Sequence, residues 1–498
     1  MLFYVDGVCG SGKTVTAIQK IAARVKTGET IIYATSTKAL LKQTMSGLEE
    51  LGVEVDLIIS DSDSGSDSYS FQDSVEKRLL AGICALEDNP RVILCITSSL
   101  IKVASKITNG LKFPLFIDEG FGVVDSGEYN SKTQSEIQGV MYFLGLSESK
   151  PEGYSHHSQY ELPDKLKKLK LYSENRCLYE IETNVGQAKF EWVAYLKLPD
   201  FLECFSEVTM LAACFEDTVD YYAAKAFGVK LVALDWGLDK EHYSNGKVTL
   251  CWVLNNNEWR TNFVRKLKSD QIERIVEEYS SMDTGLFISV KRIGQDLNLE
   301  FDFIDDDGHV IPKPESDSLT VCSHGFNSFL DYNRFISLHC QMPFPFLNKF
   351  LKTKFKMTDE QIRKAFYHYL CYQSAMRISL RTSSKKAPID VDTSFCFGDK
   401  STAMYFESKL SKSVRVEHHQ LDIGKRIDKK QPRSDKVSAN RKEQNNRMAD
   451  RKKLIALGFE EKGELADKLL ILRDWRRAHV GNRLTDKIIK DLVGASVK

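Results

Sequence analysis

Short apolar runs separated by polar, helix-forming segments dominate the first part of the chain. They occupy positions 2–5, 31–34, 92–96 and 113–117. A strand that is buried on both faces appears in a sequence as a continuous apolar run, and such strands belong to parallel sheets covered by helices. The pattern therefore predicts an α/β domain with a parallel sheet, which we assign to residues 1–235.

Further apolar runs follow later in the chain, at 286–290 and 334–339. Residues 358–380 carry apolar side chains at helical spacing, which we interpret as a helix that packs on a core.

The expected strands at 113–117 and 208–211 are about 90 residues apart, which exceeds the length of a simple connection within one sheet. We therefore expect an insertion in the first domain, at about 125–200. Within it, apolar runs at 178–183 and 190–195 flank the turn residues Asn184-Val185-Gly186-Gln187 and predict a hairpin.

Charge is distributed unevenly, although the 498 residues carry no net charge. Residues 421–498 hold 21 basic and 12 acidic side chains, and the excess is concentrated at 425–453. Such a segment is typical either of a solvated appendage or of a grip on phosphate backbone. We expect a basic, mostly helical C-terminal tail that binds nucleic acid.

Composition indicates where the protein works and in what state its cysteines are. No apolar run approaches about 18 residues and no apolar leader precedes the first strand, so we expect no membrane span. An intracellular, cytoplasmic location follows, in the host cytoplasm if the chain is viral. The 11 cysteines lack metal-binding spacing and lie mostly within apolar runs, which indicates buried thiols.

The apolar run 2–5 leads directly into a G-x-x-x-x-G-K-[ST] phosphate loop, the Walker A motif. Its glycines allow the backbone N–H groups to point at phosphates, and the dipole of the following helix adds to the attraction. We expect Lys13 to reach the β and γ phosphates of ATP and the Thr14 hydroxyl to bind Mg²⁺. The expected nucleotide-binding residues are Gly7, Val8, Cys9, Gly10, Ser11, Gly12, Lys13 and Thr14.

A pair of adjacent carboxylates, Asp118 and Glu119, ends the expected strand at 113–117. Hydrolysis of ATP needs one carboxylate on the hydrated Mg²⁺ and a second that orients and deprotonates the attacking water. We assign the metal to Asp118 and the water to Glu119.

Hydroxyl-rich segments follow two other strands, at Thr35-Ser36-Thr37 and at Thr97-Ser98-Ser99. Open α/β sheets bind ligands at the carboxyl ends of their strands. Small hydroxyls suit the phosphate oxygens of a nucleic acid strand, but they also cap helices. Both interpretations stay open, and the two roles are compatible.

The order of these segments resembles the first motor domain of superfamily-two helicases. Later segments extend the resemblance. Ala212-Ala213-Cys214-Phe215 occupies the position of the family's coupling motif, although it lacks both hydroxyls of that motif. The segment 321–327 is similar to the fifth motif, with Gly325 and Asn327 at the expected nucleotide-binding places.

The segment 373–381 resembles the sixth motif, whose arginines reach across the cleft between two motor domains to the γ-phosphate. The resemblance implies catalytic roles for Gln373, Arg377 and Arg381. Arg377 is the safer assignment, because Arg381 lies one residue later than the family pattern requires.

The resemblance implies two tandem RecA-like P-loop domains that use ATP and Mg²⁺ to move on nucleic acid. It implies that the second domain spans 245–410, with its first strand at 286–290 and a later strand at 334–339. Loose motifs of this kind are typical of a divergent, phage-type helicase or translocase. DNA is favoured over RNA, with a task in replication, recombination or repair alongside other proteins of those processes. Three alternatives stay open: a P-loop ATPase or kinase that does not move on nucleic acid, an RNA helicase, and a binding scaffold whose motor has decayed.

Overall fold

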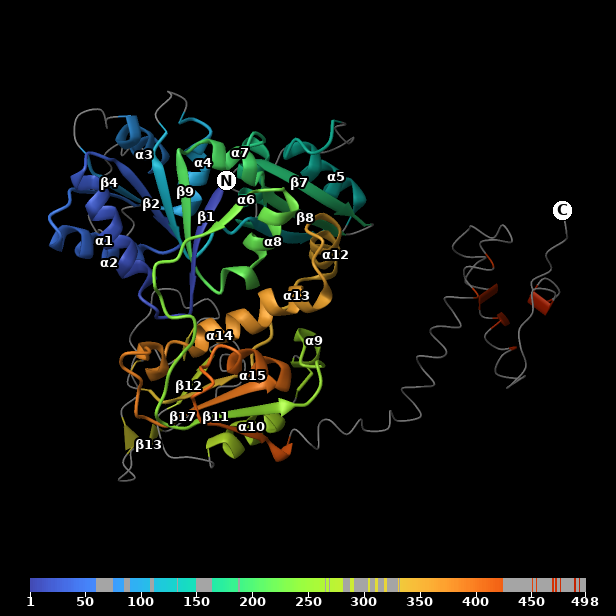
Figure 1. The fold of residues 1–498 in the computed structure, drawn as a ribbon. Helices are drawn as coiled ribbons and strands as arrows, with labels where there is room; N and C mark the ends of the chain where they lie inside the picture. Colours follow the sequence, from blue (N-terminus) through green and yellow to red (C-terminus); the bar gives the residue numbers. More distant parts are fainter. Residues whose placement is uncertain are drawn as a thin grey trace. The chain divides into compact units, whose positions relative to one another are not determined.

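The computed structural model describes most of the chain up to residue 423 and short helical pieces beyond residue 450. The described residues are 1–59, 75–84, 90–107, 112–131, 133–148, 164–186, 189–264, 266–267, 269–280, 287–290, 303–304, 310–311, 318–319, 330, 332–423, 450, 454, 468–469, 471–472, 475, 488–489 and 492. The chain divides into two compact units, Met1–Arg426 and Ile427–Lys498. The first unit contains two parallel sheets (Figure 1).

The first sheet has seven parallel strands in the order β10-β1-β9-β5-β2-β4-β3. Its strands are β1 (Leu2–Gly7), β2 (Ile31–Thr35), β3 (Val55–Ile58), β4 (Val92–Ile96), β5 (Pro114–Asp118), β9 (Glu207–Ala213) and β10 (Leu231–Ala233). The helices of this lobe are α1 (Lys13–Lys26), α2 (Lys38–Glu50), α3 (Val75–Cys84), α4 (Thr97–Ala104), α7 (Leu198–Glu203) and α8 (Val219–Ala226), with a 3-10 turn, η1 (Phe215–Asp217). The parallel α/β fold predicted for this part is confirmed.

Both faces of the first sheet are buried, which explains its uninterrupted apolar runs. Tyr4 and Ile32 belong to one apolar cluster, whereas their neighbours Val5 and Tyr33 belong to another. Successive side chains of a strand point to opposite faces, so each face receives alternate residues.

Register brings the expected site segments to one edge of the sheet. Strand β9 lies between β1 and β5, and Gly7 at the end of β1 pairs with Ala213 at the end of β9. On the other side of β5, Asp118 pairs with Thr35 of β2. The phosphate loop, the 212–215 segment, the carboxylates and one hydroxyl-rich segment therefore follow adjacent strand ends.

The insertion in the first lobe contains an antiparallel sheet of three strands. It comprises β6 (Val124–Asn130), β7 (Tyr179–Val185) and β8 (Lys189–Leu196), with α5 (Gln134–Phe143) and α6 (Asp164–Glu174). Strands β7 and β8 confirm the predicted hairpin. Gly127 is required here because a Cβ would lie 2.7 Å from the Trp192 ring. The lysines of α6 form ion pairs within the insertion, such as Lys168 with Asp125.

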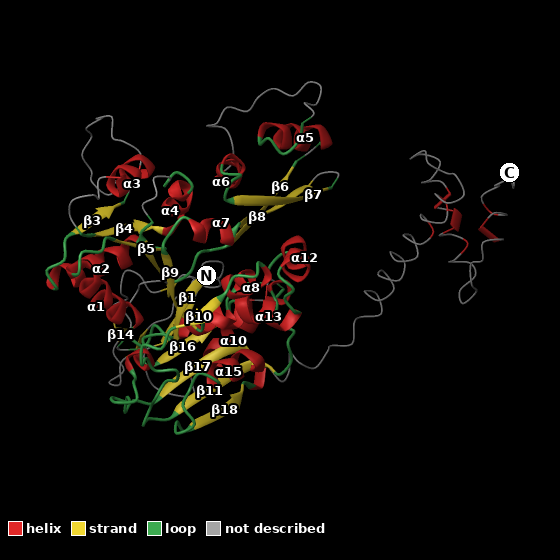
Figure 2. Cartoon of the chain, turned by 45° about the horizontal axis from the view of Figure 1, so that its top comes forward, coloured by secondary structure: helices red, strands yellow, loops and turns green. Residues whose placement is uncertain are grey.

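The second sheet has six strands, all parallel, in the order β15-β12-β16-β17-β11-β18, and Figure 2 shows β16, β17, β11 and β18 side by side. Its strands are β11 (Val248–Leu254), β12 (Phe287–Val290), β15 (Ser318–Leu319), β16 (Arg334–Ser337), β17 (Thr393–Asp399) and β18 (Val416–Gln420). A separate antiparallel pair consists of β13 (Phe303–Ile304) and β14 (Val310–Ile311).

The expectation that 286–290 forms the first strand of the second lobe is wrong. The first strand is β11, whose apolar residues are almost completely buried between β17 and β18. The sequence contains the apolar run of β11, but the motif order of the resembled family places the first strand at the later run, 286–290. Strand β18 also carries the second sheet past residue 410.

The helices of the second lobe include a long helical segment between the two sheets (Figure 1). They are α9 (Thr261–Val264), α10 (Ser269–Ser280), α12 (Pro345–Lys354), α13 (Asp359–Arg363), α14 (Tyr369–Ala375) and α15 (Lys400–Glu407). A π-helical turn, η2 (Lys364–His368), joins α13 to α14, and a 3-10 turn, η3 (Ser379–Thr382), follows. Thr358 and Gln361 start this segment with a capping box.

An apolar cluster continues from the first lobe through the insertion into α12. The ring of Tyr195 in β8 lies 5.2 Å from that of Phe350 in α12. The rings of Phe227 and Phe355 lie 5.7 Å apart. The two lobes are therefore packed together on one side by aromatic side chains.

The described residues of the second unit form a small apolar cluster of their own, built on Leu454, Leu472 and Ile489. Most of the basic segment 425–453 lies outside the described residues. None of the described helices combines the length and the apolar character needed to cross a membrane. Described cysteines are free thiols, and six of them are buried.

Candidate active site

The phosphate loop connects β1 to α1 with two glycines in left-handed conformations, Gly10 at φ +78° and Gly12 at φ +83°. Lys13 begins α1 and is 9% exposed. Its ammonium donates to the carbonyl oxygens of Val8, at 2.7 Å, and Gly7, at 3.2 Å. Burial lowers the pKa of Lys13. The loop thus has the backbone conformation and the lysine that phosphate binding requires.

The Thr14 hydroxyl donates to Oδ2 of Asp118 at 2.7 Å, and the Tyr33 hydroxyl donates to the same oxygen at 2.8 Å. Asp118 is 3% exposed. Burial and the neighbouring Glu119 raise the pKa of Asp118, against the opposing hydrogen bonds. A hydroxyl and a carboxylate are hard oxygen ligands, which fit Mg²⁺ beside a phosphate loop. Tyr33 was missed, although a tyrosine in a buried strand needs a partner for its hydroxyl.

Glu119 lies at the turn after β5, in a left-handed conformation at φ +71°. Its N–H donates to the carbonyl oxygen of Leu211 at 3.0 Å. The hydroxyl of Ser36 donates to Oε2 of Glu119 at 3.1 Å. One of the hydroxyl-rich segments is therefore in direct contact with the expected catalytic carboxylate.

Asp220 of α8 holds the loop that follows Glu119. Its carboxylate accepts hydrogen bonds from the N–H groups of Phe121, at 2.7 Å, and Val123, at 3.0 Å. A Cβ on Gly120 would lie 2.8 Å from the same carboxylate. Burial raises the pKa of Asp220, and the backbone hydrogen bonds counteract that shift. This contact of Asp220 was not predicted, because nothing in the local sequence shows that a single aspartate on a helix binds a distant loop.

The second lobe contacts the phosphate loop directly. The N–H of Cys9 donates to the hydroxyl of Tyr372 in α14 at 2.9 Å. That hydroxyl also bonds to Nε2 of His242 at 2.9 Å. Burial and the nearby Lys13 and Arg381 lower the pKa of His242 to about 3, so this imidazole is neutral at physiological pH. The backbone of Arg381 is so close that its carbonyl oxygen would lie 2.2 Å from a Cβ on Gly10.

Arg377 follows α14 and is 4% exposed. Burial and the neighbouring charge of Arg381 lower the pKa of Arg377 to about 10, while Cys9 and Glu119 act in the opposite direction. The guanidinium therefore stays charged at neutral pH and lies within electrostatic reach of groups in the first lobe. Gln373 is half-buried and donates to the Tyr369 hydroxyl at 2.6 Å.

Two of the remaining expected residues, Gly325 and Asn327, lie outside the described residues. The 212–215 segment is described. Cys214 lies at the end of β9 with φ +47°, and the N–H of Phe215 donates to the carboxylate of Asp6 at 3.0 Å.

The structure confirms the helix-capping interpretation for one hydroxyl-rich segment, and phosphate binding stays a prediction. The Thr37 hydroxyl accepts a hydrogen bond from Leu40 N at 3.3 Å and so caps α2. The hydroxyls of Thr35 and Thr97 are buried, and no hydrogen-bond partner for either is found in the structure.

No family model and no curated protein matches the chain. Similar solved structures are helicases at low sequence identity. An XPD helicase has 11% identity and a TM-score of 0.47, over 84% of this chain and 96% of that chain. Xpd4 of S. tokodaii has 11% identity and a TM-score of 0.45 over the same shares. S. cerevisiae Dbp5 bound to RNA and ADP BeF3 has 12% identity and a TM-score of 0.35, over 86% and 87%. The chemistry of the site therefore rests on the chain's own residues.

Substitution of Asp118 by asparagine tests its role as a metal ligand. Because burial and Glu119 raise the pKa of Asp118, the stabilisation from this carboxyl decreases as pH rises through that pKa, and an uncharged amide in its place avoids that loss. We expect Asp118→Asn to unfold at an equal or higher temperature than the wild type without Mg²⁺ and ATP. In calorimetry, Mg²⁺ and ATP at 100 times Kd should raise the free energy of unfolding of the wild type by about 2.7 kcal/mol, and the variant should lack this increase. A lower unfolding temperature together with an undiminished gain would contradict the assignment.

Proposed function

We propose that this chain is an ATP-dependent nucleic acid motor, a helicase or translocase, that hydrolyses ATP between its two lobes. The observation that carries this proposal is the division of the site. Thr14, Asp118 and Glu119 belong to the first lobe. Arg377 belongs to the second, five residues after Tyr372, whose hydroxyl accepts a hydrogen bond from the phosphate-loop N–H of Cys9. A site assembled from two lobes links nucleotide chemistry to lobe movement, which is how a motor does work.

The residues of the site suit in-line attack of water on the γ-phosphate. Lys13 and the loop amides bind phosphate, and Thr14 with Asp118 holds Mg²⁺, which neutralises charge on the phosphates when bound. Glu119 accepts the proton of the attacking water. Arg377 supplies positive charge from the opposite lobe, with Arg381 and Gln373 beside it.

A nucleic acid strand is the proposed partner, and DNA is favoured over RNA. The hydroxyl-rich segments after β2 and β4 lie at adjacent strand ends, because Thr35 pairs with Ile96. Backbone phosphates are recognised by hydroxyls and N–H groups of this kind. Since Ser36 touches Glu119, a strand bound over this segment would act directly on the catalytic carboxylate.

The first test of the proposal is hydrolysis of ATP with single-stranded DNA, duplex DNA and RNA as activators. Lys13→Ala should lose both ATP binding and turnover. Glu119→Gln should bind ATP while turnover falls by at least about 10²-fold, because only proton transfer is removed. Glu49→Gln, at an exposed position of α2, is the matched control.

The activators separate the candidate functions. Stimulation by a nucleic acid supports a motor, and the activator that stimulates most identifies the strand. Turnover that no nucleic acid changes would exclude the motor and favour an ATPase of another kind. Strand displacement on a partial duplex then distinguishes a helicase from a translocase.

The second test addresses Arg377. Arg377→Ala should bind ATP and nucleic acid but lose stimulated hydrolysis by about 10³-fold, the range for an arginine that acts across a cleft. Arg377→Lys keeps the charge of this buried side chain and serves as a folding control, and Arg415→Ala controls for exposed positive charge. If Arg381→Ala loses activity and Arg377→Ala does not, the assignment of the two arginines is reversed.

The third test addresses the basic tail. The cut belongs after Arg426, because Leu421 is buried and the N–H of Ile423 donates to Glu278 at 3.0 Å. The shortened chain should keep its basal ATPase and bind nucleic acid more weakly. The salt dependence of binding should fall by about 0.7 to 0.9 per lost phosphate contact. An unchanged salt slope would contradict a phosphate grip.

A further inference from the structure

A carboxylate of the first lobe is surrounded by polar groups of the second. Asp217 ends η1, directly after the 212–215 segment. Its Oδ2 accepts hydrogen bonds from the Lys409 ammonium and the Tyr405 hydroxyl, both at 2.8 Å. Its Oδ1 lies 3.4 Å from the Lys364 ammonium. The Asp217 side chain is 14% exposed and that of Lys409 is 19% exposed.

Asp217 and Lys409 each favour the charged form of the other. Burial alone would raise the pKa of Asp217, but Lys409, Tyr405 and Lys364 hold it below its usual range. Burial alone would lower the pKa of Lys409, but Cys214 and Asp217 raise it. Both partners are therefore charged at neutral pH, and their partial burial limits screening by solvent and salt.

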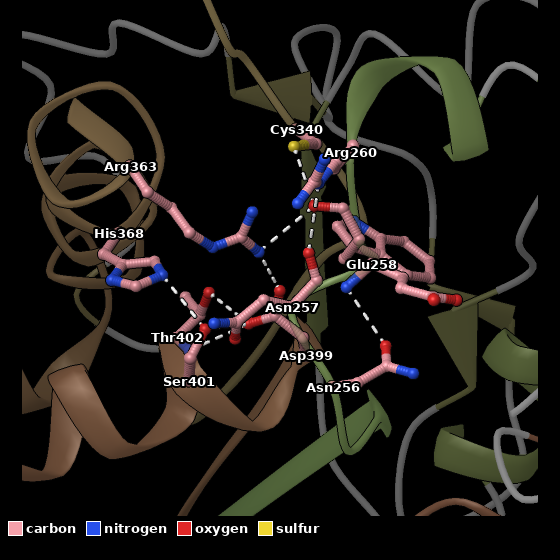
Figure 3. Close-up of polar contacts among 11 residues, drawn as sticks. Asn256, Asn257, Glu258, Arg260, Cys340, Arg363, His368, Asp399, Ser401 and Thr402 are labelled. Atoms are coloured by element: carbon pink, nitrogen blue, oxygen red, sulfur yellow. Dashed lines mark hydrogen bonds and ion pairs between the residues drawn. The ribbon is translucent and has the colours of Figure 1, made fainter. Parts of the chain in front are cut away.

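The elements that carry the second-lobe residues of the cluster are anchored in the core of that lobe. Arg363, next to Lys364, points toward the carboxylate of Asp399 (Figure 3) and donates to it and to the Trp259 carbonyl. Asp399 in turn caps α15, the helix that carries Tyr405. One buried carboxylate therefore links the two helical elements that carry Lys364 and Tyr405.

The first-lobe side is tied to the phosphate loop. The N–H of Phe215 donates to Asp6, the residue immediately before the loop. The N–H of Cys214 donates to the carbonyl oxygen of Gly7 at 3.2 Å. A displacement of Asp217 relative to the loop would strain these two hydrogen bonds.

We propose that Asp217 forms an interlobe clasp with Lys409, Tyr405 and Lys364, and that the clasp positions Arg377 against the ATP site. Lys364 lies in the helical segment that ends at Ala375, and Arg377 follows two residues after that end. From Lys364 to Ala375 the segment spans about 16 Å at 1.5 Å per residue. Fixing Lys364 therefore sets where the other end of the segment lies. Asp217 acts through Arg377 and is a positioning residue.

The clasp also supplies a contact that the 212–215 segment cannot make. In the resembled family this segment couples hydrolysis to movement through hydroxyls, which are absent here. Asp217 follows the segment directly and reaches the second lobe by charge instead. This inference rests on the proposed function, because it assigns the clasp to hydrolysis between the lobes.

Its test compares Asp217→Asn and Lys409→Gln with the wild type. Both variants should bind ATP with unchanged affinity, because neither residue touches the phosphate loop, and both should lose nucleic-acid-stimulated kcat by about 10- to 100-fold. The double variant, Asp217→Asn with Lys409→Gln, should lose less kcat than the product of the two single losses, because both changes remove the same ion pair. Asp359→Asn removes an exposed ion pair within the second lobe and is the matched control, expected to keep full activity.

A double-mutant cycle separates positioning from a purely structural role. If the clasp acts through Arg377, Asp217→Asn should cause no further loss of kcat in the Arg377→Ala background. Losses that multiply in the double variant would overturn the proposal, as would full activity in both single variants. Losses that multiply in Asp217→Asn with Lys409→Gln would overturn the pairing.

Lobe separation gives a readout that does not depend on activity. With fluorophores on the two lobes and a non-hydrolysable ATP analogue, the variants should show lower energy transfer than the wild type. If the wild type itself lacks nucleic-acid-stimulated ATPase, the proposed function fails while this measurement still tests the clasp. Unchanged transfer in both variants would show that the cluster does not hold the lobes.

Discussion

The parallel register of β1, β9, β5 and β2 is the constraint on which the site depends. Because neighbouring strands run in the same direction, their carboxyl ends meet at one edge. Gly7, Ala213, Asp118 and Thr35 reach that edge in paired register. A shift of one residue in β1 or β5 would move the side chains of that strand to the opposite face of the sheet and change the position of Thr14 relative to Asp118. Burial of both sheet faces makes such a shift costly, so the packing of the core determines where the site residues lie.

The two lobes meet through contacts of two kinds. Aromatic rings of β8, α12 and the end of α8 pack together at one side of the interface. Near the phosphate loop, the contacts are directional: Cys9 with Tyr372, and Asp217 with Lys409. Apolar contacts tolerate small rotations, whereas hydrogen bonds and ion pairs depend steeply on geometry. The aromatic side is therefore suited to stay closed while the polar side responds to nucleotide.

The sequence predicted the elements and residues that have local patterns. The continuous apolar runs identified β1, β2, β4, β5 and β9 of the first sheet, but not the edge strands β3 and β10. Turn residues between two apolar runs identified the β7–β8 hairpin. The motifs placed Lys13 after the loop that follows β1 and Asp118 at the end of β5. Partners that come from far along the chain were not predicted. Tyr33, Asp220 and Asp217 are single polar residues whose roles appear only when distant segments meet.

The helical segment predicted at 358–380, which in the structure ends at Ala375, illustrates the same limit. Its apolar stripe predicted burial, and the structure confirms that Ile362, Ala365 and Tyr369 are buried. Periodicity gives the face of a helix but not what lies opposite, which here is the phosphate loop of the other lobe. Strand β11 was not predicted for a different reason. The motif order of the resembled family placed the first strand of the second lobe at a later apolar run.

Backbone strain at the site explains why these distant partners are needed. Among the described non-glycine residues, only Glu119, Cys214 and Lys356 have positive φ. Glu119 and Cys214 end two adjacent strands of the first sheet, and each such conformation costs about 1 to 3 kcal/mol. The structure holds each turn with a carboxylate that accepts backbone hydrogen bonds just beyond it, Asp220 after Glu119 and Asp6 after Cys214. Carboxylates that bind no substrate thus keep the site in its strained geometry, and their replacement would relax it without touching a catalytic group.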